Sequence, residues 1–416
     1  MRKIFLYVFS AFVSIISIDN ANAQCVVVNG QNIGPDGKPC INTIVSAVPF
    51  LRITPDARSG AMGDAGIALS ADPNAIHFNP SKLPFSESEM GVAMTYTPWL
   101  RALGLTDVYL ANLAGYRKIG DRQAVGIGLK YFNLGSINFT DEAGVPLGTG
   151  RPNEFEISAT YARKLSSNFG LSLSGKYIYS NLAAGQQIGS VTIKAANAFA
   201  VDFGATYITQ TNFSGIKSDL ALGLAISNIG SKITYTQSIN KDYLPQNIGI
   251  GAAWNFHIDE YNSLTFALDI NKLLVPTPVP AKLTDSNNNT IPNPEYDKNG
   301  NSIPDYKEKS PISAALSSFG DASGSEELRE LTYSAGAEYW YDKQFAVRAG
   351  YYYEDNTKGA RKYFTVGLGL KYNIFGMNFS YLVPTTNQRN PLDNTLRFSL
   401  LFDFAPVKEE ATPVTE

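Results

Sequence analysis

Histidine and cysteine are scarce in this chain, which has two of each among its 416 residues. Structural metal sites usually combine four such side chains, so we predict no metal site. His77 and His257 lie in unlike segments, and the sequence has no G-x-S-x-G, H-E-x-x-H or P-loop pattern. We therefore predict a protein that is not an enzyme and needs no cofactor.

Charged residues are also few, at 17% of the chain, and the formal net charge is only -3. No run of lysine and arginine occurs, so nucleic acid is not an expected partner. The mean hydropathy of -0.11 excludes a bundle of transmembrane helices, because each would need about 20 consecutive apolar residues. It is compatible with a membrane β-barrel, whose strands are apolar on one face only.

Residues 1–23 are predicted to be a secretory signal peptide. Arg2 and Lys3 precede an apolar run, and Ala21-Asn22-Ala23 supplies the small residues of a cleavage site. A first transmembrane helix is the weaker interpretation, because the apolar run is short and ends in polar residues.

Cys25 and Cys40 are predicted to form a disulfide that closes an N-terminal hairpin. Turn-forming residues between them, among them Asn29-Gly30, would bring the two sulfurs together, and an exported compartment would oxidise them. Two free thiols are the alternative. Lipidation of Cys25 is rejected, because Gln24 stands where a small residue is expected.

Tyrosine, phenylalanine and glycine are abundant, with 23, 23 and 35 residues, a composition that favours strands and tight turns. From Gly91 onward, segments of about ten residues alternate apolar with small or polar residues. In one of them Phe155 and Ile157 point one way while Glu154 and Glu156 point the other way. We count about fourteen such segments, near residues 90–98, 105–118, 122–134, 153–165, 168–182, 196–209, 217–230, 246–257, 261–273, 329–341, 344–354, 361–373, 375–383 and 394–404.

The two faces of these segments favour a membrane barrel over a soluble sandwich. The polar face is rich in glycine, serine, threonine and charged residues, and aromatic residues gather near the segment ends, as in the girdles of outer-membrane barrels. A soluble all-β protein explains the period of two, but not so many apolar faces together with a signal peptide and little charge. We predict an all-β fold, a transmembrane antiparallel β-barrel at residues 90–404 followed by a tail at 405–416.

The connections between the segments are expected to form two classes that alternate along the chain. Short, charged turns are predicted at 116–122, 163–169, 255–262 and 339–345. Long loops are predicted at 135–152, 183–195, 231–245, 274–328 and 384–393. In outer-membrane barrels the short turns are periplasmic and the long loops extracellular, so the long-loop rim is the expected partner surface.

The longest loop, 274–328, is rich in acid and amide side chains between Asp297 and Glu308. Their spacing follows that of an EF-hand calcium loop, but Ser302 stands where that loop needs a glycine and no flanking helices are evident. We therefore expect a solvated loop. Residues 313–331 are predicted to form one or two short helices.

Residues 24–89 are predicted to be an N-terminal extension and a plug inside the barrel. The stretch 49–83 is neither strand-like nor helix-periodic, and it places charges between closely spaced glycines and prolines. A polar lumen could satisfy such a segment, whereas the alternative is a surface loop with helix caps. The plug charges are expected to pair with one another or with the lumen, and they are Arg52, Asp56, Arg58 and Asp64. Lys358, by contrast, is placed in a loop.

The stretch from Phe50 to Gly66 reads F-L-R-x-x-P-D-A-R-x-x-x-M-G-D-A-G, and Asn79-Pro80-Ser81 follows. It resembles the N-terminal signature of the PorV family, also described as LptO, an outer-membrane component of the type IX secretion system of Bacteroidetes. FadL-type transporters, which are plugged barrels, are more distant relatives. The residues that carry the resemblance are Arg52, Asp56, Arg58, Gly63, Asp64, Gly66, Asn79 and Pro80. Ser81 is a departure, because the wider family usually has alanine there.

The resemblance implies a non-enzymatic carrier in the outer membrane. Such a protein would bind the C-terminal signal domain of secreted cargo at the large translocon and bring it to a sortase-like attachment complex, with outer-membrane lipids around the barrel. Two alternatives remain open. A FadL-like transporter of hydrophobic small molecules would need an apolar path through the plug, and a lipopolysaccharide O-deacylase would need a nucleophile and a base.

Overall fold

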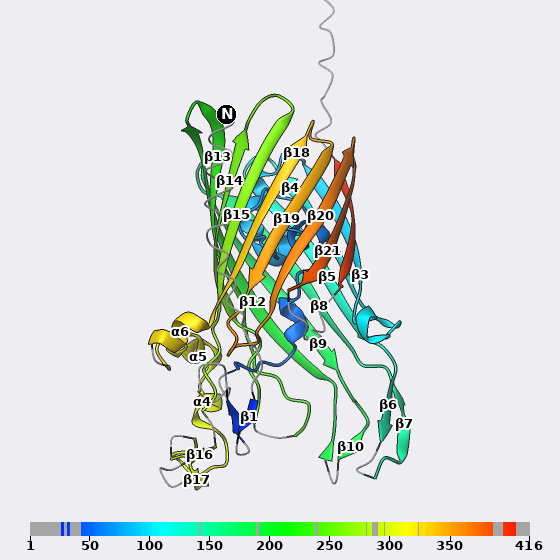
Figure 1. Ribbon diagram of the computed structural model, residues 1–416, viewed down its shortest axis with the longest axis vertical. Helices are drawn as coiled ribbons and strands as arrows, with labels where there is room; N and C mark the ends of the chain where they lie inside the picture. Colours follow the sequence, from blue (N-terminus) through cyan, green and yellow to red (C-terminus); the bar gives the residue numbers. More distant parts are fainter. Residues whose placement is uncertain are drawn as a thin grey trace, which may run out of the picture.

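In the computed structural model, the described residues are 26–28, 31–33, 43–140, 143–188, 191–237, 240–279, 281–284, 290–294, 296–322, 324–385 and 394–404. Within them, fourteen antiparallel strands close into one barrel (Figure 1). Neighbouring strands pair as hairpins, and β22 pairs with β3 to complete the ring. The barrel strands are β3 (Met90–Pro98), β4 (Val108–Ile119), β5 (Gln123–Leu134), β8 (Asn153–Lys164), β9 (Phe169–Asn181), β12 (Ala196–Phe213), β13 (Ile216–Gly230), β14 (Asn247–His257), β15 (Asn262–Leu273), β18 (Leu331–Tyr341), β19 (Phe345–Tyr353), β20 (Lys362–Tyr372), β21 (Phe375–Pro384) and β22 (Leu396–Phe404).

The alternation of side chains along these strands is inverted relative to a soluble protein. In β8, Glu154 and Glu156 are buried in the lumen, while Ile157 is exposed on the outer face. The same pattern of exposed apolar and buried polar residues recurs around the barrel. An apolar outer face with a polar interior suits a lipid surround, and closure leaves no strand edge without partners. The predicted transmembrane barrel is confirmed, and a soluble sandwich is excluded.

The connections differ sharply between the two ends of the barrel (Figure 1). At the long-loop rim, two small hairpins and three short helices extend beyond the barrel strands. These are β6 (Ile137–Thr140) with β7 (Pro146–Gly150), β10 (Gln187–Ile188) with β11 (Val191–Thr192), α4 (Asp305–Glu308), α5 (Pro311–Ser317) and α6 (Gly324–Arg329), and the pair β16 (Lys282–Thr284) with β17 (Thr290–Pro292) lies in the same loop as the helices. Two connections that the sequence did not single out, 99–107 with η3 (Arg101–Leu103) and 354–361, lie at this rim as well. No helix in the described part of the chain is long and apolar enough to cross a membrane.

Residues 43–89, here called the plug segment, run through the inside of the barrel from one rim to the other (Figure 1). At the long-loop end Ala47 N–H donates to the Tyr243 carbonyl at 2.9 Å, and at the short-turn end Glu89 N–H donates to the Phe404 carbonyl at 3.0 Å. The segment holds only short helical turns, which are η1 (Pro49–Arg52), α2 (Ala57–Gly60), α3 (Ala75–Phe78) and η2 (Pro80–Phe85).

The N-terminal hairpin of β1 (Val26–Val28) and β2 (Gln31–Ile33) lies beside the long-loop rim (Figure 1). The predicted signal peptide at 1–23, the cysteines Cys25 and Cys40, and the tail at 405–416 lie outside the described residues. The disulfide and the cleavage site therefore stay predictions.

Apolar packing fixes the plug segment near both ends of the lumen. At the long-loop end, Val48, Phe50 and Leu51 pack against Trp99 and Phe132 in a buried cluster, and the Phe50 and Phe132 rings are stacked at 6.4 Å. Toward the other end, a second buried cluster joins the plug segment to β4 and β5, and it consists of Ala75, Ile76, Leu83, Ala114, Tyr116 and Ala124. Burial of this apolar surface stabilises the segment inside the barrel by about 25 cal/mol per Å².

Candidate functional site

Arg58 joins the plug segment to the barrel wall through a buried charge cluster. Asp56 caps α2 by accepting a hydrogen bond from Ser59 N–H at 2.8 Å, and this cap orients Arg58 toward β18. The Arg58 Nε and Nη2 atoms donate to the two Glu338 carboxylate oxygens at 2.9 and 2.7 Å. Arg348 Nε donates to the same carboxylate at 2.6 Å. Asp72, 3.3 Å from Arg58, adds the second negative charge that balances two arginines.

Gly63 and Asp64 anchor the next turn of the plug segment against β18 to β20. Gly63 has a φ of +66°, and a Cβ there would lie 2.5 Å from the Tyr351 carbonyl oxygen, so only glycine fits. Its N–H donates to Thr365 Oγ1 at 2.9 Å. Asp64 accepts a hydrogen bond from the Tyr363 hydroxyl and lies 3.7 Å from Arg397 Nη2.

The remaining signature residues, Gly66, Asn79 and Pro80, position the stretch that leads from α2 through α3 to η2. The N–H groups of Gly66 and Ile67 donate to one Asp269 oxygen at 2.7 and 2.9 Å. Asn79 caps η2, and its side-chain amide donates to the Ala205 carbonyl at 3.0 Å. Pro80 occupies the first turn of η2, where a missing N–H has no cost. The signature thus specifies how the plug segment is seated in the lumen.

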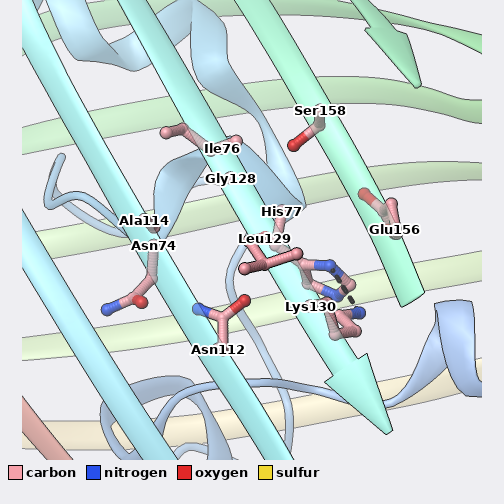
Figure 2. A pocket seen from close by; sticks show the side chains of 10 residues that line it. All are labelled: Asn74, Ile76, His77, Asn112, Ala114, Gly128, Leu129, Lys130, Glu156 and Ser158. Atoms are coloured by element: carbon pink, nitrogen blue, oxygen red, sulfur yellow. Dashed lines mark hydrogen bonds between the residues drawn. The ribbon is translucent and has the colours of Figure 1, made fainter. Parts of the chain in front are cut away.

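Lys130 of β5 holds the plug segment from the wall opposite β18. Figure 2 shows its ammonium group beside the His77 imidazole. Its Nζ atom donates to the Leu51 and Ile53 carbonyls at 3.1 Å each and lies 3.0 Å from His77 Nδ1. An ammonium group can only donate a hydrogen bond, so the His77 Nδ1 atom is the acceptor in this contact. The cavity beside them has a volume of about 10 Å³ and is too small for a ligand larger than water.

The lumen residues Glu154, Glu156 and Lys176 all point inward, as predicted from the strand alternation. Lys176 Nζ lies 2.6 Å from Asp202 and 3.5 Å from Glu156, and Glu154 accepts a hydrogen bond from Ser180 at 2.6 Å. Sequence reasoning missed the wall partners of the plug, of which Glu338 and Arg348 are fully buried. The sequence indicated these partners only through one charged residue in each strand, on the inward face among small and apolar residues.

Arg52 differs from the other signature charges. Among the described residues it forms no hydrogen bond and no ion pair with a carboxylate, and Asp56 forms no ion pair either and accepts only from Ser59 N–H of the plug segment. Both findings correct the expectation that each of these charges pairs with another or with a lumen residue. Arg52 lines a second lumen cavity instead. The geometry explains this: η1 lies at the long-loop end, where the nearby Glu354 is already paired with Arg361.

The long-loop rim has an unusual arrangement of charge and apolar surface on α5 and α6. Glu330, just after α6, shares its carboxylate between Lys272 and Lys358. Lys358 lies in the connection 354–361, a loop as predicted, and its side chain is buried there.

Ala314 of α5 packs against Tyr243 and Val275 in a small buried cluster. The larger apolar side chains of these helices face outward, with Leu316 71% and Leu328 66% exposed. Charged groups and Ala314 therefore anchor the helices, and the large apolar groups are left on the surface.

The stretch from Asp297 to Glu308 forms hydrogen bonds within itself. Asp297 accepts from Gly300 N–H at 2.8 Å, and the Asn299 amide donates to Glu308 at 2.8 Å. In the described part of the chain, no three histidine, cysteine or acidic side chains are grouped so as to hold a metal ion. His257 and His77 lie apart, and His257 contacts Asp219 at 2.7 Å on the exposed short-turn side.

Comparisons with known proteins give one family and several solved barrels. The family model described as type IX secretion system protein PorV matches residues 38–280. The toluene transporter TbuX of Ralstonia pickettii is 13% identical with a TM-score of 0.48, over 84% of this chain and 98% of that one. The toluene transporter TodX of Pseudomonas putida is 10% identical with a TM-score of 0.46, over 87% of this chain and 97% of that one. A FadL homologue of Pseudomonas aeruginosa is 11% identical with a TM-score of 0.40, over 87% of this chain and 100% of that one. A search of curated proteins finds no match.

Proposed function

Because the chain belongs to the family of the type IX secretion system protein PorV, we propose that it is a non-enzymatic carrier of secreted proteins. It is an outer-membrane component of that system. In the proposed role it binds the C-terminal signal domain of cargo at the translocon and brings it to the sortase-like attachment complex at the cell surface. The long-loop rim is the docking surface.

The observation that carries this proposal is the filled lumen. Both ends of the plug segment are packed by apolar clusters, and its middle is bound to the wall through Arg58, Lys130 and Asp269. No room remains for a folded domain inside a barrel of this strand number. A specific protein interface needs about 800 Å² per partner, and only the outer surfaces offer that area.

The long-loop rim supports the proposal through its projecting elements. The β6–β7 and β10–β11 hairpins and α4 to α6 extend past the barrel strands (Figure 1). They expose apolar side chains of the kind that protein interfaces bury, and these include Val145, Leu147, Val191, Ile312, Leu316 and Phe319. The short turns at the opposite rim offer no comparable platform.

The test is co-purification of cargo from native membranes with variants of the rim and of the lumen. One set of variants replaces residues 135–152 or 183–195 by tight turns. The matched lumen variant is Glu154→Gln, which keeps the shape of a buried side chain that bonds to Ser180. Heat-modifiable gel migration confirms that each barrel is folded.

We expect the rim variants to lose co-purifying cargo and Glu154→Gln to retain it. The opposite outcome, with cargo kept by every rim variant and lost on substitution of Glu154, Glu156 or Lys176, would favour a path through the barrel. Transport of hydrophobic molecules would then be the better interpretation, and the plug segment would have to move.

A further inference from the structure

A cavity of about 120 Å³ lies between the plug segment and the barrel wall of β13 to β15 and β18 to β20. It is large enough for several water molecules or for a small polar group. Nine of its nineteen lining residues carry a hydroxyl or an amide, among them Thr54, Asn228, Asn271, Thr332 and Tyr352. The wall residues come from the half of each strand that is nearer to the long-loop rim.

Four of the five charged groups that line this cavity have partners. Lys176 is paired with Asp202, and Arg361 donates two hydrogen bonds of 2.7 Å to Glu354. Asp269 accepts the N–H groups of Gly66 and Ile67, and Asp64 is held by Tyr363 and Arg397. Arg52 is the fifth, and it has neither a hydrogen bond nor an ion pair among the described residues.

The Arg52 side chain is half-buried and has no ion-pair partner of its own, because the nearby Glu354 carboxylate is already bound by Arg361. Burial and the neighbouring Arg361 guanidinium lower the pKa of Arg52, although an arginine remains protonated near neutral pH. A charge withdrawn from water without an ion-pair partner is destabilised, and a bound anion offsets that cost. The planar fork of a guanidinium fits a carboxylate with two parallel hydrogen bonds.

We propose that this cavity binds the carboxylate of a compact hydrophilic ligand, with Arg52 as its charged partner. A single negative charge suits the site better than a phosphate dianion, because the carboxylates of Asp64 and Asp269 line the same cavity. The polar lining disfavours a long acyl chain. The ligand is either a free small carboxylate or the terminal carboxylate of a peptide, and the inference holds whether or not the chain carries cargo.

Saturation-transfer NMR on the full-length barrel in a neutral detergent tests this. The probes are acetate, N-acetyl-diglycine, its C-terminal amide, inorganic phosphate and octanoate, each at the same ionic strength. The test variant is Arg52→Gln. The control is Arg101→Gln, which changes an exposed arginine at the same rim, and heat-modifiable migration shows that both variants are folded.

We expect signals from acetate or N-acetyl-diglycine with the native protein and Arg101→Gln, and a loss of at least about tenfold with Arg52→Gln. A signal from acetate alone identifies a free small carboxylate, and a stronger signal from N-acetyl-diglycine than from its amide identifies a chain terminus. The proposal is overturned if no carboxylate gives a signal, if the signal survives in Arg52→Gln, or if phosphate competes better than both carboxylates. Preferred binding of octanoate independent of Arg52 would also overturn it.

Discussion

Among the plug contacts, the Arg58–Glu338–Arg348 cluster is expected to contribute most to seating the segment. Arg58→Ala would leave Glu338 with one arginine and remove two hydrogen bonds of 2.7 and 2.9 Å. Breaking one partner of a buried ion pair costs about 3–5 kcal/mol. We expect a clear fall in the yield of folded, heat-modifiable barrel. Arg122→Ala, at an exposed short turn, should leave the yield unchanged, and equal yields would show that Arg58 does not seat the plug.

Gly63 separates the effect of backbone conformation from the effect of close packing. Gly63 and Gly120 have nearly the same φ, +66° and +61°, but only Gly63 has wall atoms where a Cβ would lie. A residue with a Cβ costs about 1–2 kcal/mol in this conformation at either position. Gly63→Ala should therefore lower the urea concentration at the unfolding midpoint far more than Gly120→Ala. Similar unfolding midpoints would mean that the contact with Tyr351 and Ala335 is not tight.

At the residue scale the sequence predicted which plug residues matter but not what they contact. The signature charges and glycines could be selected because their types demand polar partners and special backbone angles. Their partners, such as Glu338 and Asp269, lie more than 200 residues away and depend on strand register around the closed ring. The assumption that every charge in the plug has an ion-pair partner fails for Arg52, because its side chain lines a cavity.

At the scale of elements, the period of two predicted the strands well. All fourteen barrel strands lie where alternating segments were expected, because lipid on one side and a polar lumen on the other impose strict alternation. Inside the loops, the short helices expected at 313–331 are present as α5 and α6. The hairpin β6–β7 was not predicted, because it has no buried face that would leave a pattern.

The connection 274–328 should depend on Glu330. Its carboxylate contacts Lys272, Lys358 and the Thr277 hydroxyl and is buried. Glu330→Gln removes the charge that holds both lysines, and hydrogen bonds to charged groups contribute about 1.5–3 kcal/mol. We expect trypsin to cut this connection roughly tenfold faster in intact cells, because the local opening becomes more frequent.

The control for that experiment is Glu260→Gln, which changes an exposed acid at a short turn on the other rim. Its cleavage rate should match that of the native protein. If Glu330→Gln were cut no faster, the remaining pairs of Lys272 with Glu327 and Lys358 with Glu326 would suffice to hold α6.

At the scale of the whole molecule, the barrel holds the hairpins and short helices of the long-loop rim at one of its two ends. The plug segment crosses the lumen and packs against the wall near both rims. The sequence indicated this architecture through the long and short connections and the charged, glycine-rich segment before the strands. It did not predict that the plug segment starts at the long-loop end, because the direction in which a segment crosses the lumen does not change the pattern of its residues.

The central claim is that cargo docks on the long-loop rim, and site-specific photo-crosslinking in the native bacterium tests it most directly. A photoreactive amino acid is placed at Leu147 or Leu316 on that rim, at Ser167 or Lys343 on the short turns, and at Glu154 in the lumen. The probe is a secreted C-terminal signal domain fused to a fluorescent protein. The account predicts crosslinks from the long-loop rim only. Crosslinks confined to the short turns or to Glu154 would contradict it.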